Sequence, residues 1–436
     1  MISVMQMRIS VVGGGYVGLV SAVCFSELGH NVNLIEIDQT KVNAINQGRS
    51  PIYEKGLDEM LSAHAGKNLT ATSSYENIPD SEVVLICVGT PPSQDGGADL
   101  TMIASAARSI GIALQESDGY HIVAVKSTVP PGTTEHLVNP TVLKYSGKGA
   151  DESGNSLKDI GFVMNPEFLR EGLAVQDFMK PDRIVVGSSD QKAGDTFERV
   201  YSSLEAPLIR TSLTAAEMIK YTSNAFLATK ISFSNEIGNI CKRLGIDVYE
   251  VMKGVGLDHR INPHFLNAGA GFGGSCFPKD VSALMHLAKD VGEEPVLLNA
   301  VVKINDRQPM RMIELLEKRV GDLQGKRIAV MGLAFKNDTD DARESRAIPV
   351  IMELKRKGAE IAAYDPQASS SMSKIIPDIA YCANPSEALK MADACLVMTE
   401  WPQFSLLDKE FDVMRSTVII EGRRILSYND AEGICW

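Results

Sequence analysis

The sequence contains few cysteines, and they are widely scattered. Seven occur in 436 residues, an odd number with no CxxC pair. This excludes a disulfide framework and does not fit a zinc site, so we expect a reducing compartment, the cytoplasm, and no bound metal. No apolar run approaches the roughly 18 to 20 residues that span a bilayer. Met1 to Gln6 lack the basic region of a secretory signal.

Basic charge is also scarce. The chain has 43 Lys and Arg against 55 Asp and Glu, a formal charge of -12. No overall positive field would therefore attract nucleic acid or a membrane surface, and any phosphate must be bound by local geometry. The apolar fraction of 44% and the charged fraction of 22% are typical of a globular protein. At roughly 100 to 200 residues per domain, the length indicates two to four domains.

A strand, a glycine turn and a helix open the chain. Met7 to Val12 is apolar, Gly13-Gly14-Gly15-Tyr16-Val17-Gly18 follows, and a helical pattern runs to Leu28. A second strand, Asn31 to Ile37, carries Glu36 near its end. In this context GxGxxG binds a dinucleotide pyrophosphate at the helix N-terminus, and the acidic residue accepts the ribose hydroxyls. Because a carboxylate repels a 2'-phosphate, NAD is predicted over NADP; a turn that serves only packing is the alternative.

The alternation of strands and helices continues through the first third of the chain and recurs near its end. Further buried strands at Glu82 to Val88, Ile122 to Lys126 and Gly161 to Met164 make the first third of the chain a doubly wound α/β domain. Arg327 to Gly332 resembles the first strand, but no GxGxxG follows it. Ten additional residues predict a loop at Lys336 to Ser345 with another role. We therefore predict an α/β protein with two Rossmann-like doubly wound domains, joined by a long central helix and a helical dimerisation region.

The central helix is predicted from about Thr214 to Leu244, where about thirty residues contain no proline. A helix of this length bridges domains or packs against a partner subunit. Glu217, Lys220 and Asn224 share one face of it. A solvated ion pair between Glu217 and Lys220 is the alternative to a functional role.

Two strand ends and one helix start carry reactive groups. Lys126-Ser127-Thr128 and Asn165-Pro166-Glu167 follow buried strands, where open α/β sheets bind ligands. For each segment, a functional and a structural role remain equally open. Cys276 precedes a helical pattern and lies three residues before Lys279. Helix N-termini and nearby cations stabilise thiolates, so Cys276 is predicted to be a nucleophile, whereas the other cysteines are predicted to be buried.

Taken together, these motifs resemble those of the UDP-glucose/GDP-mannose dehydrogenase family of nucleotide-sugar 6-dehydrogenases. The similarity extends over nearly the whole chain. Its ordered motifs are GGGYVG, VGTP, KSTVPPGTT, NPEFLREG, EMIKYTSNAF, FLNAGAGFGGSCFPKD, GLAFKNDTDDARES and EGRR. The resemblance implies oxidation of a sugar C6 alcohol to a carboxylate with two NAD. It also implies an NAD-binding domain at 1–205, a helical dimerisation domain at 206–320 and a nucleotide-sugar domain at 321–436, in a homodimer or larger homo-oligomer.

The resemblance also implies three sets of site residues. The catalytic set is Cys276 as nucleophile, Lys220, Asn224 and Asp280 around the reacting carbon, and Thr128 with Glu167 for water and proton transfer. The NAD set is Gly13, Gly15, Tyr16, Val17, Gly18, Glu36, Lys41, Thr90, Thr128, Glu171, Lys279 and Arg343. The substrate set is Glu167, Phe168, Leu169, Arg170, Glu171, Lys220, Asn224, Phe265, Leu266, Asn267, Ala268, Gly269, Gly273, Lys336 and Arg424. Glu36 and Glu421 stand where the family usually has Asp, and Ala268 replaces a common proline, so we expect altered reach with function retained.

The nucleotide sugar itself is predicted less directly. NPEFLREG and KSTVPPGTT are more similar to enzymes that act on UDP-glucose or GDP-mannose than to those that act on N-acetylated sugars. UDP-glucose is the leading substrate and GDP-mannose the alternative. A catalytically silent sensor of NAD or nucleotide sugar is a hypothesis of another class, but it would have lost the nucleophile or the Lys220 group, and both are present.

Overall fold

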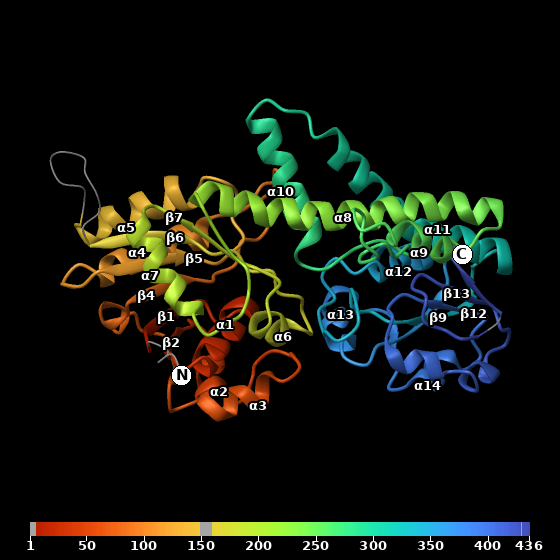
Figure 1. Cartoon of the computed structure of the whole chain (residues 1–436). Coiled ribbons are helices and arrows are strands. Elements are labelled where there is room, and N and C mark those ends of the chain that lie inside the picture. Colours follow the sequence, from red (N-terminus) through yellow and green to blue (C-terminus); the bar gives the residue numbers. More distant parts are fainter. Residues whose placement is uncertain (1–5, 149–158, 429) are drawn as a thin grey trace. The chain divides into compact units, whose positions relative to one another are not determined.

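The computed structural model describes residues 6–148, 159–428 and 430–436. The chain divides into two compact units, Met1–Thr222 and Ser223–Trp436. The division falls within helix α8, Leu213–Leu244, which is drawn in green in Figure 1. The predicted helix from Thr214 to Leu244 is thus confirmed to within one residue. None of the helices among the described residues combines the length and the apolar character needed to cross a membrane.

The first unit is built on an eight-stranded sheet in the order β3-β2-β1-β4-β5-β6-β7-β8. Its neighbouring strands are parallel except for β6 and β7, which pair antiparallel. The strands are β1 Arg8–Val12, β2 Asn31–Ile35, β3 Leu69–Thr72, β4 Val83–Ile86, β5 His121–Val125, β6 Ile160–Met164, β7 Ile184–Ser188 and β8 Leu208–Thr211. The helices before α8 are α1 Tyr16–Glu27, α2 Gln39–Asn46, α3 Leu57–His64, α4 Thr101–Ala113, α5 Asn139–Ser146, α6 Ala174–Met179 and α7 Gln191–Glu198, with short helical turns η1 Ile78–Asp80, η2 Thr134–Val138 and η3 Arg199–Tyr201.

Both faces of this sheet are covered. In β4, Val83 and Leu85 belong to a core with α1 and α7, whereas Val84 and Ile86 belong to a second core with α4. Alternate residues of a strand point to opposite faces, and both sets are apolar here, as expected of a sheet buried on both sides. The predicted doubly wound domain is confirmed, and the carboxyl ends of its central strands lie along one edge, where ligands bind in such folds.

The second unit contains a parallel six-stranded sheet in the order β11-β10-β9-β12-β13-β14. The strands are β9 Arg327–Met331, β10 Glu360–Tyr364, β11 Ala380–Tyr381, β12 Ala394–Val397, β13 Ile419–Glu421 and β14 Ala431–Gly433. The helices after α8 are α9 Val248–Gly256, α10 Phe277–Asp290, α11 Val296–Val320, α12 Ala347–Arg356, α13 Ser369–Ile375 and α14 Pro385–Leu389, with η4 Pro402–Leu406 and η5 Glu410–Val413. The predicted second Rossmann-like domain is confirmed. The predicted insertion at 336–345 is a loop between β9 and α12.

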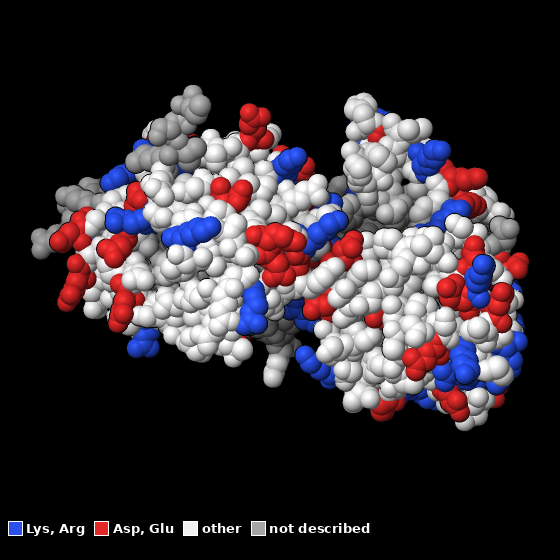
Figure 2. Space-filling view, turned by 90° about the horizontal axis from the view of Figure 1, so that it is seen from below, with Lys and Arg blue, Asp and Glu red and all other residues white. Residues whose placement is uncertain are grey.

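Charges of both signs are mixed on the surface. On the face that Figure 2 draws, Lys and Arg lie among Asp and Glu and form no extended basic patch. This distribution agrees with the net charge of -12. Binding of a phosphate-bearing ligand therefore depends on local groups rather than on a long-range field.

Candidate active site

The glycine turn after β1 is shaped by close packing on one side and open space on the other. Gly13 has φ +106°, and a Cβ there would lie 2.8 Å from the Cys87 carbonyl oxygen. A Cβ at Gly18 would overlap the Gly13 carbonyl oxygen. Nothing lies within 4 Å of a Cβ at Gly15, which is the N-cap of α1 and gives it no side-chain cap. The start of α1 is therefore uncapped and uncrowded at Gly15, as binding of a pyrophosphate by the first amides of a helix requires.

Glu36 is placed to receive a ribose. Its Oε2 accepts a hydrogen bond from Gly14 N (3.1 Å) and its Oε1 one from Asp38 N (2.9 Å). The Lys41 ammonium lies 3.9 Å from Oε2. A carboxylate has about four acceptor positions, so about two remain for the two hydroxyls of an adenosine ribose. These residues fit NAD.

We expect the cofactor preference to depend on Glu36. In the double variant Glu36→Ser/Ile37→Arg, the repelling carboxylate is replaced and a cation is introduced at a position that is 86% exposed. The ratio of kcat/KM with NADP to that with NAD should rise about a hundredfold or more, as a charge reversal near a phosphate would give. Ile37→Arg alone is the matched control and should change the ratio much less. Equal use of both cofactors by the unaltered enzyme would contradict the role of Glu36.

In the second sheet, the acid that corresponds to Glu36 is Asp365, and hydrogen bonds occupy all of its acceptor positions. Asp365 follows β10 as Glu36 follows β2. Its Oδ2 accepts from Leu333 N (2.6 Å), Ala334 N (3.0 Å) and Trp401 Nε1 (3.0 Å), and its Oδ1 accepts from the amides of residues 367 and 368. With five donors, this carboxylate has no acceptor position left for a ribose. The first sheet alone fits the dinucleotide.

Other predicted NAD residues are linked to strand ends. Thr90 Oγ1 donates to the Thr128 carbonyl oxygen (2.8 Å), which ties the segments after β4 and β5 together. The Tyr16 hydroxyl donates to the Glu54 carboxylate, and the Gly172 amide donates to both residues. Burial raises the pKa of Tyr16, and the Glu54 carboxylate raises it further. Glu54 is a buried member of this site that the sequence analysis missed, because a lone acid between Tyr53 and Lys55 carries no local signal.

Glu167 and Lys220 form a buried ion pair in the first unit. Glu167 Oε1 lies 2.9 Å from Lys220 Nζ, and the side chains are 6% and 4% exposed. Glu167 Oε2 accepts from Leu169 N (2.6 Å), and Lys220 Nζ lies 5.5 Å from the Phe168 ring centre. Burial alone would raise the pKa of Glu167, but the Lys220 charge and the hydrogen bonds outweigh it and lower the pKa overall. Two buried charges after a strand end are typical of a functional site.

The alternative of a solvated Glu217–Lys220 pair is wrong. Glu217 is fully buried and accepts hydrogen bonds from Gly132 N (2.5 Å), Thr134 N (2.8 Å) and Thr134 Oγ1 (2.6 Å). Burial nevertheless raises the pKa of Glu217. Its carboxylate anchors the segment after Thr128, so Glu217 supports the strand end from α8 instead of neutralising Lys220.

In the second unit, a buried polar cluster surrounds the start of α10. Cys276 is the N-cap of this helix and is partly exposed, whereas the other six cysteines are buried as predicted. Asp280, 1% exposed, accepts from Asn224 Nδ2 (2.6 Å), and its other oxygen lies 2.5 Å from Lys279 Nζ. The structure thus brings together three predicted site residues, Asn224, Lys279 and Asp280, beside the helix start that Cys276 caps.

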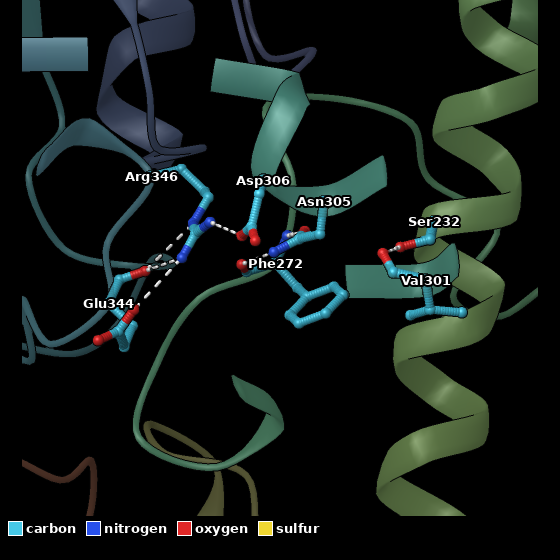
Figure 3. A network of polar contacts seen from close by, with 7 residues as sticks. All are labelled: Ser232, Phe272, Val301, Asn305, Asp306, Glu344 and Arg346. Atoms are coloured by element: carbon cyan, nitrogen blue, oxygen red, sulfur yellow. Dashed lines mark hydrogen bonds and ion pairs between the residues drawn. The ribbon is translucent and has the colours of Figure 1, made fainter. Parts of the chain in front are cut away.

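The loop before Cys276 is held by amide side chains that the sequence analysis missed. In Figure 3, Asn305 of α11 faces the Phe272 backbone. Its Oδ1 accepts from Phe272 N (2.7 Å), and its Nδ2 donates to Phe272 O (3.1 Å). Gly269 is bound in the same way, because its N donates to Asn235 (2.7 Å) and its O accepts from Gln308 (2.9 Å). Paired backbone groups fix the loop before any ligand arrives.

Four predicted basic residues lie in more open surroundings. Arg343 pairs with Asp341 (2.7 Å), and Lys336 is partly exposed in the loop after β9. Arg424 is exposed, pairs with Asp247 (2.7 Å) and lies 4.9 Å from the Tyr249 ring centre. Arg170 likewise pairs with Asp177 (2.6 Å). Each of the three arginines pairs with an acidic neighbour.

Comparison with known proteins identifies relatives over the full length. The UDP-glucose 6-dehydrogenase of Haloferax volcanii is 46% identical over 426 residues, 97% of each chain. The structure of a UDP-glucose dehydrogenase from Pyrobaculum islandicum is similar with a TM-score of 0.93 and 40% identity, and the match covers 100% of this chain and 99% of that one. A GDP-mannose dehydrogenase from Pseudomonas aeruginosa, solved as a ternary complex, has 35% identity and a TM-score of 0.56, with 99% and 100% covered.

Three family domains match in chain order. Residues 7–205 match the NAD binding domain, residues 214–307 the central domain and residues 329–428 the UDP binding domain. The glycine turn, Glu36 and Glu167 lie in the first of these, and Lys220, Cys276 and Asp280 lie in the second. The chain belongs to the UDP-glucose/GDP-mannose dehydrogenase family.

Proposed function

We propose that this protein is an NAD-dependent UDP-glucose 6-dehydrogenase that converts the C6 alcohol to the carboxylate of UDP-glucuronate. The observation that carries the proposal is the partly exposed Cys276 at the start of α10, one turn before the buried Asp280 with its bonds to Asn224 and Lys279. The UDP-glucose enzymes at 46% and 40% identity support UDP-glucose over GDP-mannose.

Release of NADH from a panel of nucleotide sugars tests this proposal. We expect UDP-glucose to give the highest kcat/KM and two NADH per sugar acid formed. A higher value with GDP-mannose would transfer the assignment to the alternative substrate. Binding of NAD and nucleotide sugar without any NADH would favour the sensor hypothesis.

In the first oxidation, NAD supplies a hydride acceptor and the protein supplies the base and the charge compensation. Glu167, with Thr128 at the neighbouring strand end, takes the C6 hydroxyl proton, directly or through water. Lys220 stabilises the developing oxyanion, and Asn224 adds an amide donor one helical turn away. The low pKa of Glu167 suits a group that must be ionised when the substrate binds.

In the second oxidation, Cys276 acts as the nucleophile. Its thiolate adds to the C6 aldehyde and gives a thiohemiacetal, which becomes a thioester when it loses its hydroxyl proton and transfers a hydride to a second NAD. Water, deprotonated by Glu167, then hydrolyses the thioester and frees the thiol. The covalent link keeps the aldehyde from escaping between the two steps. Asp280 orients Asn224 and Lys279 through the bonds described above.

In this proposal the protein also functions as a homodimer, which forms through α8 and the helical domain at 206–320. In the sequence, that domain follows the NAD-binding domain at 1–205 and precedes the nucleotide-sugar domain at 321–436. Phe226, Phe233 and Ile240 of α8 are 64%, 49% and 51% exposed. Residues seven apart lie on one side of a helix. Large exposed apolar side chains in such a row are typical of a subunit interface.

The six buried cysteines form no disulfide, which supports the cytoplasm as the compartment.

Phe233→Asp should dissociate this dimer, because it places a charge in the centre of the apolar row. Light scattering at micromolar concentration should give the mass of one chain instead of two or more. Lys374→Asp, a charge change at an exposed position of α13, outside the proposed dimerisation domain, is the control and should leave the mass unchanged. A stable, active monomer of the unaltered protein would refute the assembly.

A further inference from the structure

Lys126, directly after β5, is a buried cation. Its side chain is almost fully inaccessible, at 4% exposure. Nζ donates to Asn165 Oδ1 (3.0 Å) and to the Tyr201 hydroxyl (3.2 Å), and it lies 5.7 Å from the Phe178 ring centre. In the stretches of chain that the structure describes, no carboxylate oxygen lies within 4.0 Å of Nζ. The ammonium group is therefore buried against neutral partners.

The fold does not need this charge for its hydrogen bonding. The Tyr201 hydroxyl also donates to Asn165 Oδ1 (2.6 Å), and Asn165 Nδ2 donates to the Val185 carbonyl oxygen (2.9 Å). If Lys126 were apolar, every one of these donors would keep its acceptor. Burial lowers the pKa of Lys126 to about 8, so the cation is costly, and a costly charge that no neighbour requires indicates a functional use.

Lys126 lies beside the segment that carries Glu167, because its Nζ donates to Asn165 Oδ1. Asn165 begins the turn that leads two residues later to Glu167, and the turn is bound to β5 because Asn165 N donates to Val125 O (2.9 Å). The titratable groups that face Lys126 are Cys24 of α1, Cys87 after β4, Glu167 after β6, Tyr201 of η3 and Lys220 of α8. Burial raises the pKa of Cys24, Cys87 and Tyr201, which keeps them neutral. Glu167 is therefore the one anion in this set.

We propose that Lys126 is a positioning residue for Glu167: held against Asn165, its charge acts together with that of Lys220 to keep Glu167 as the carboxylate that accepts a proton. The inference rests on the role of Glu167 in the proposed function. Lys126 would act on the reaction only through Glu167.

Lys126→Met tests this inference, because methionine has a similar length and no charge. With one of its two cations removed, the pKa of Glu167 should rise. The acid limb of the kcat profile should therefore move to higher pH, so we expect kcat to fall severalfold near pH 5 and less near pH 8, with little change in the KM for NAD. Tm near neutral pH should be unchanged or higher, because the variant no longer buries a charge. Lys192→Met, at an exposed lysine on α7, is the control and should change none of these values.

Two outcomes would overturn the role of Lys126. One is a kcat within twofold of the original at both pH values. The other is a deficit that does not depend on pH and accompanies a lower Tm, because a structural role alone would give that result. Glu167→Gln separates this inference from the function on which it rests. If Glu167→Gln stays fully active, the role of Glu167 in the proposed function fails. If Glu167→Gln is inactive while Lys126→Met is normal, only the inference fails.

Discussion

Cys276→Ser is expected to stall the enzyme after the first oxidation, with complete four-electron turnover reduced at least about a thousandfold. A serine hydroxyl has almost no anionic form near neutral pH and is a poor leaving group from an ester, so both the addition and the hydrolysis become slow. The unaltered enzyme should release two NADH per sugar acid, whereas the variant should release fewer. Mass spectrometry of the intact chain should detect sugar that remains attached as an ester.

Folding and NAD binding should survive this change. The substitution is nearly isosteric, and Cys276 lies at a partly exposed helix start, outside the glycine turn. Cys382→Ser, at a buried cysteine near the second sheet, is the matched control and should retain two NADH per product. If Cys276→Ser turned over near the original rate with this stoichiometry, Cys276 would be a structural residue and the thioester mechanism would be wrong.

Lys220→Met should destabilise the protein and inactivate it. The change leaves the buried Glu167 carboxylate without its ion-pair partner, and breaking a buried pair in this way costs about 3 to 5 kcal/mol of the free energy of unfolding. The loss of oxyanion stabilisation should lower kcat about a hundredfold or more. Both effects are measurable, the first by denaturant unfolding and the second by NADH release.

The double variant Lys220→Met/Glu167→Gln separates these effects. A neutral amide replaces the lone carboxylate, so most of the stability should return while the activity does not. Acid unfolding should differ as well. The pKa of Glu167 is lower in the folded protein than its ordinary value of 4.5. Its contribution to stability is therefore present above about that pH and is lost as the pH falls through the folded value. The double variant should lack this contribution. If activity returned together with stability, the Lys220 charge would have no catalytic role.

Local patterns were sufficient to predict much of this fold. The first βαβ unit, the long helix and the second sheet each depend on hydrophobic periodicity and glycine placement within a short stretch of chain, and all three are confirmed. The antiparallel pairing of β6 with β7 was not predicted. The direction of a strand within a sheet depends on tertiary packing, to which the run Ile184–Ser188 gives no local clue.

The site was predicted by residue type and motif, but its pairings were not. Spacing placed Glu217 beside Lys220 on α8, yet Glu217 binds the segment at Gly132 and Lys220 binds Glu167. These partners are 50 or more residues apart in sequence, so helical spacing could not reveal them. Asn305 and Gln308 were missed for the same reason, because a buried amide on a helix has meaning only through the backbone that it binds.

The occupied carboxylate of Asp365 has a consequence for the history of the two sheets. Its five donors come from the turn after β9, the segment after β10 and the Trp401 indole. The Asp365 carboxylate therefore has a structural role, in which it holds these segments together. Inserting glycines into that turn would not restore a dinucleotide site, because freeing Asp365 would leave buried donors without acceptors. Each substitution toward a dinucleotide site would lower the free energy of unfolding before a bound ligand could raise it. If the halves arose by duplication, the specialisation of the second copy is therefore close to irreversible.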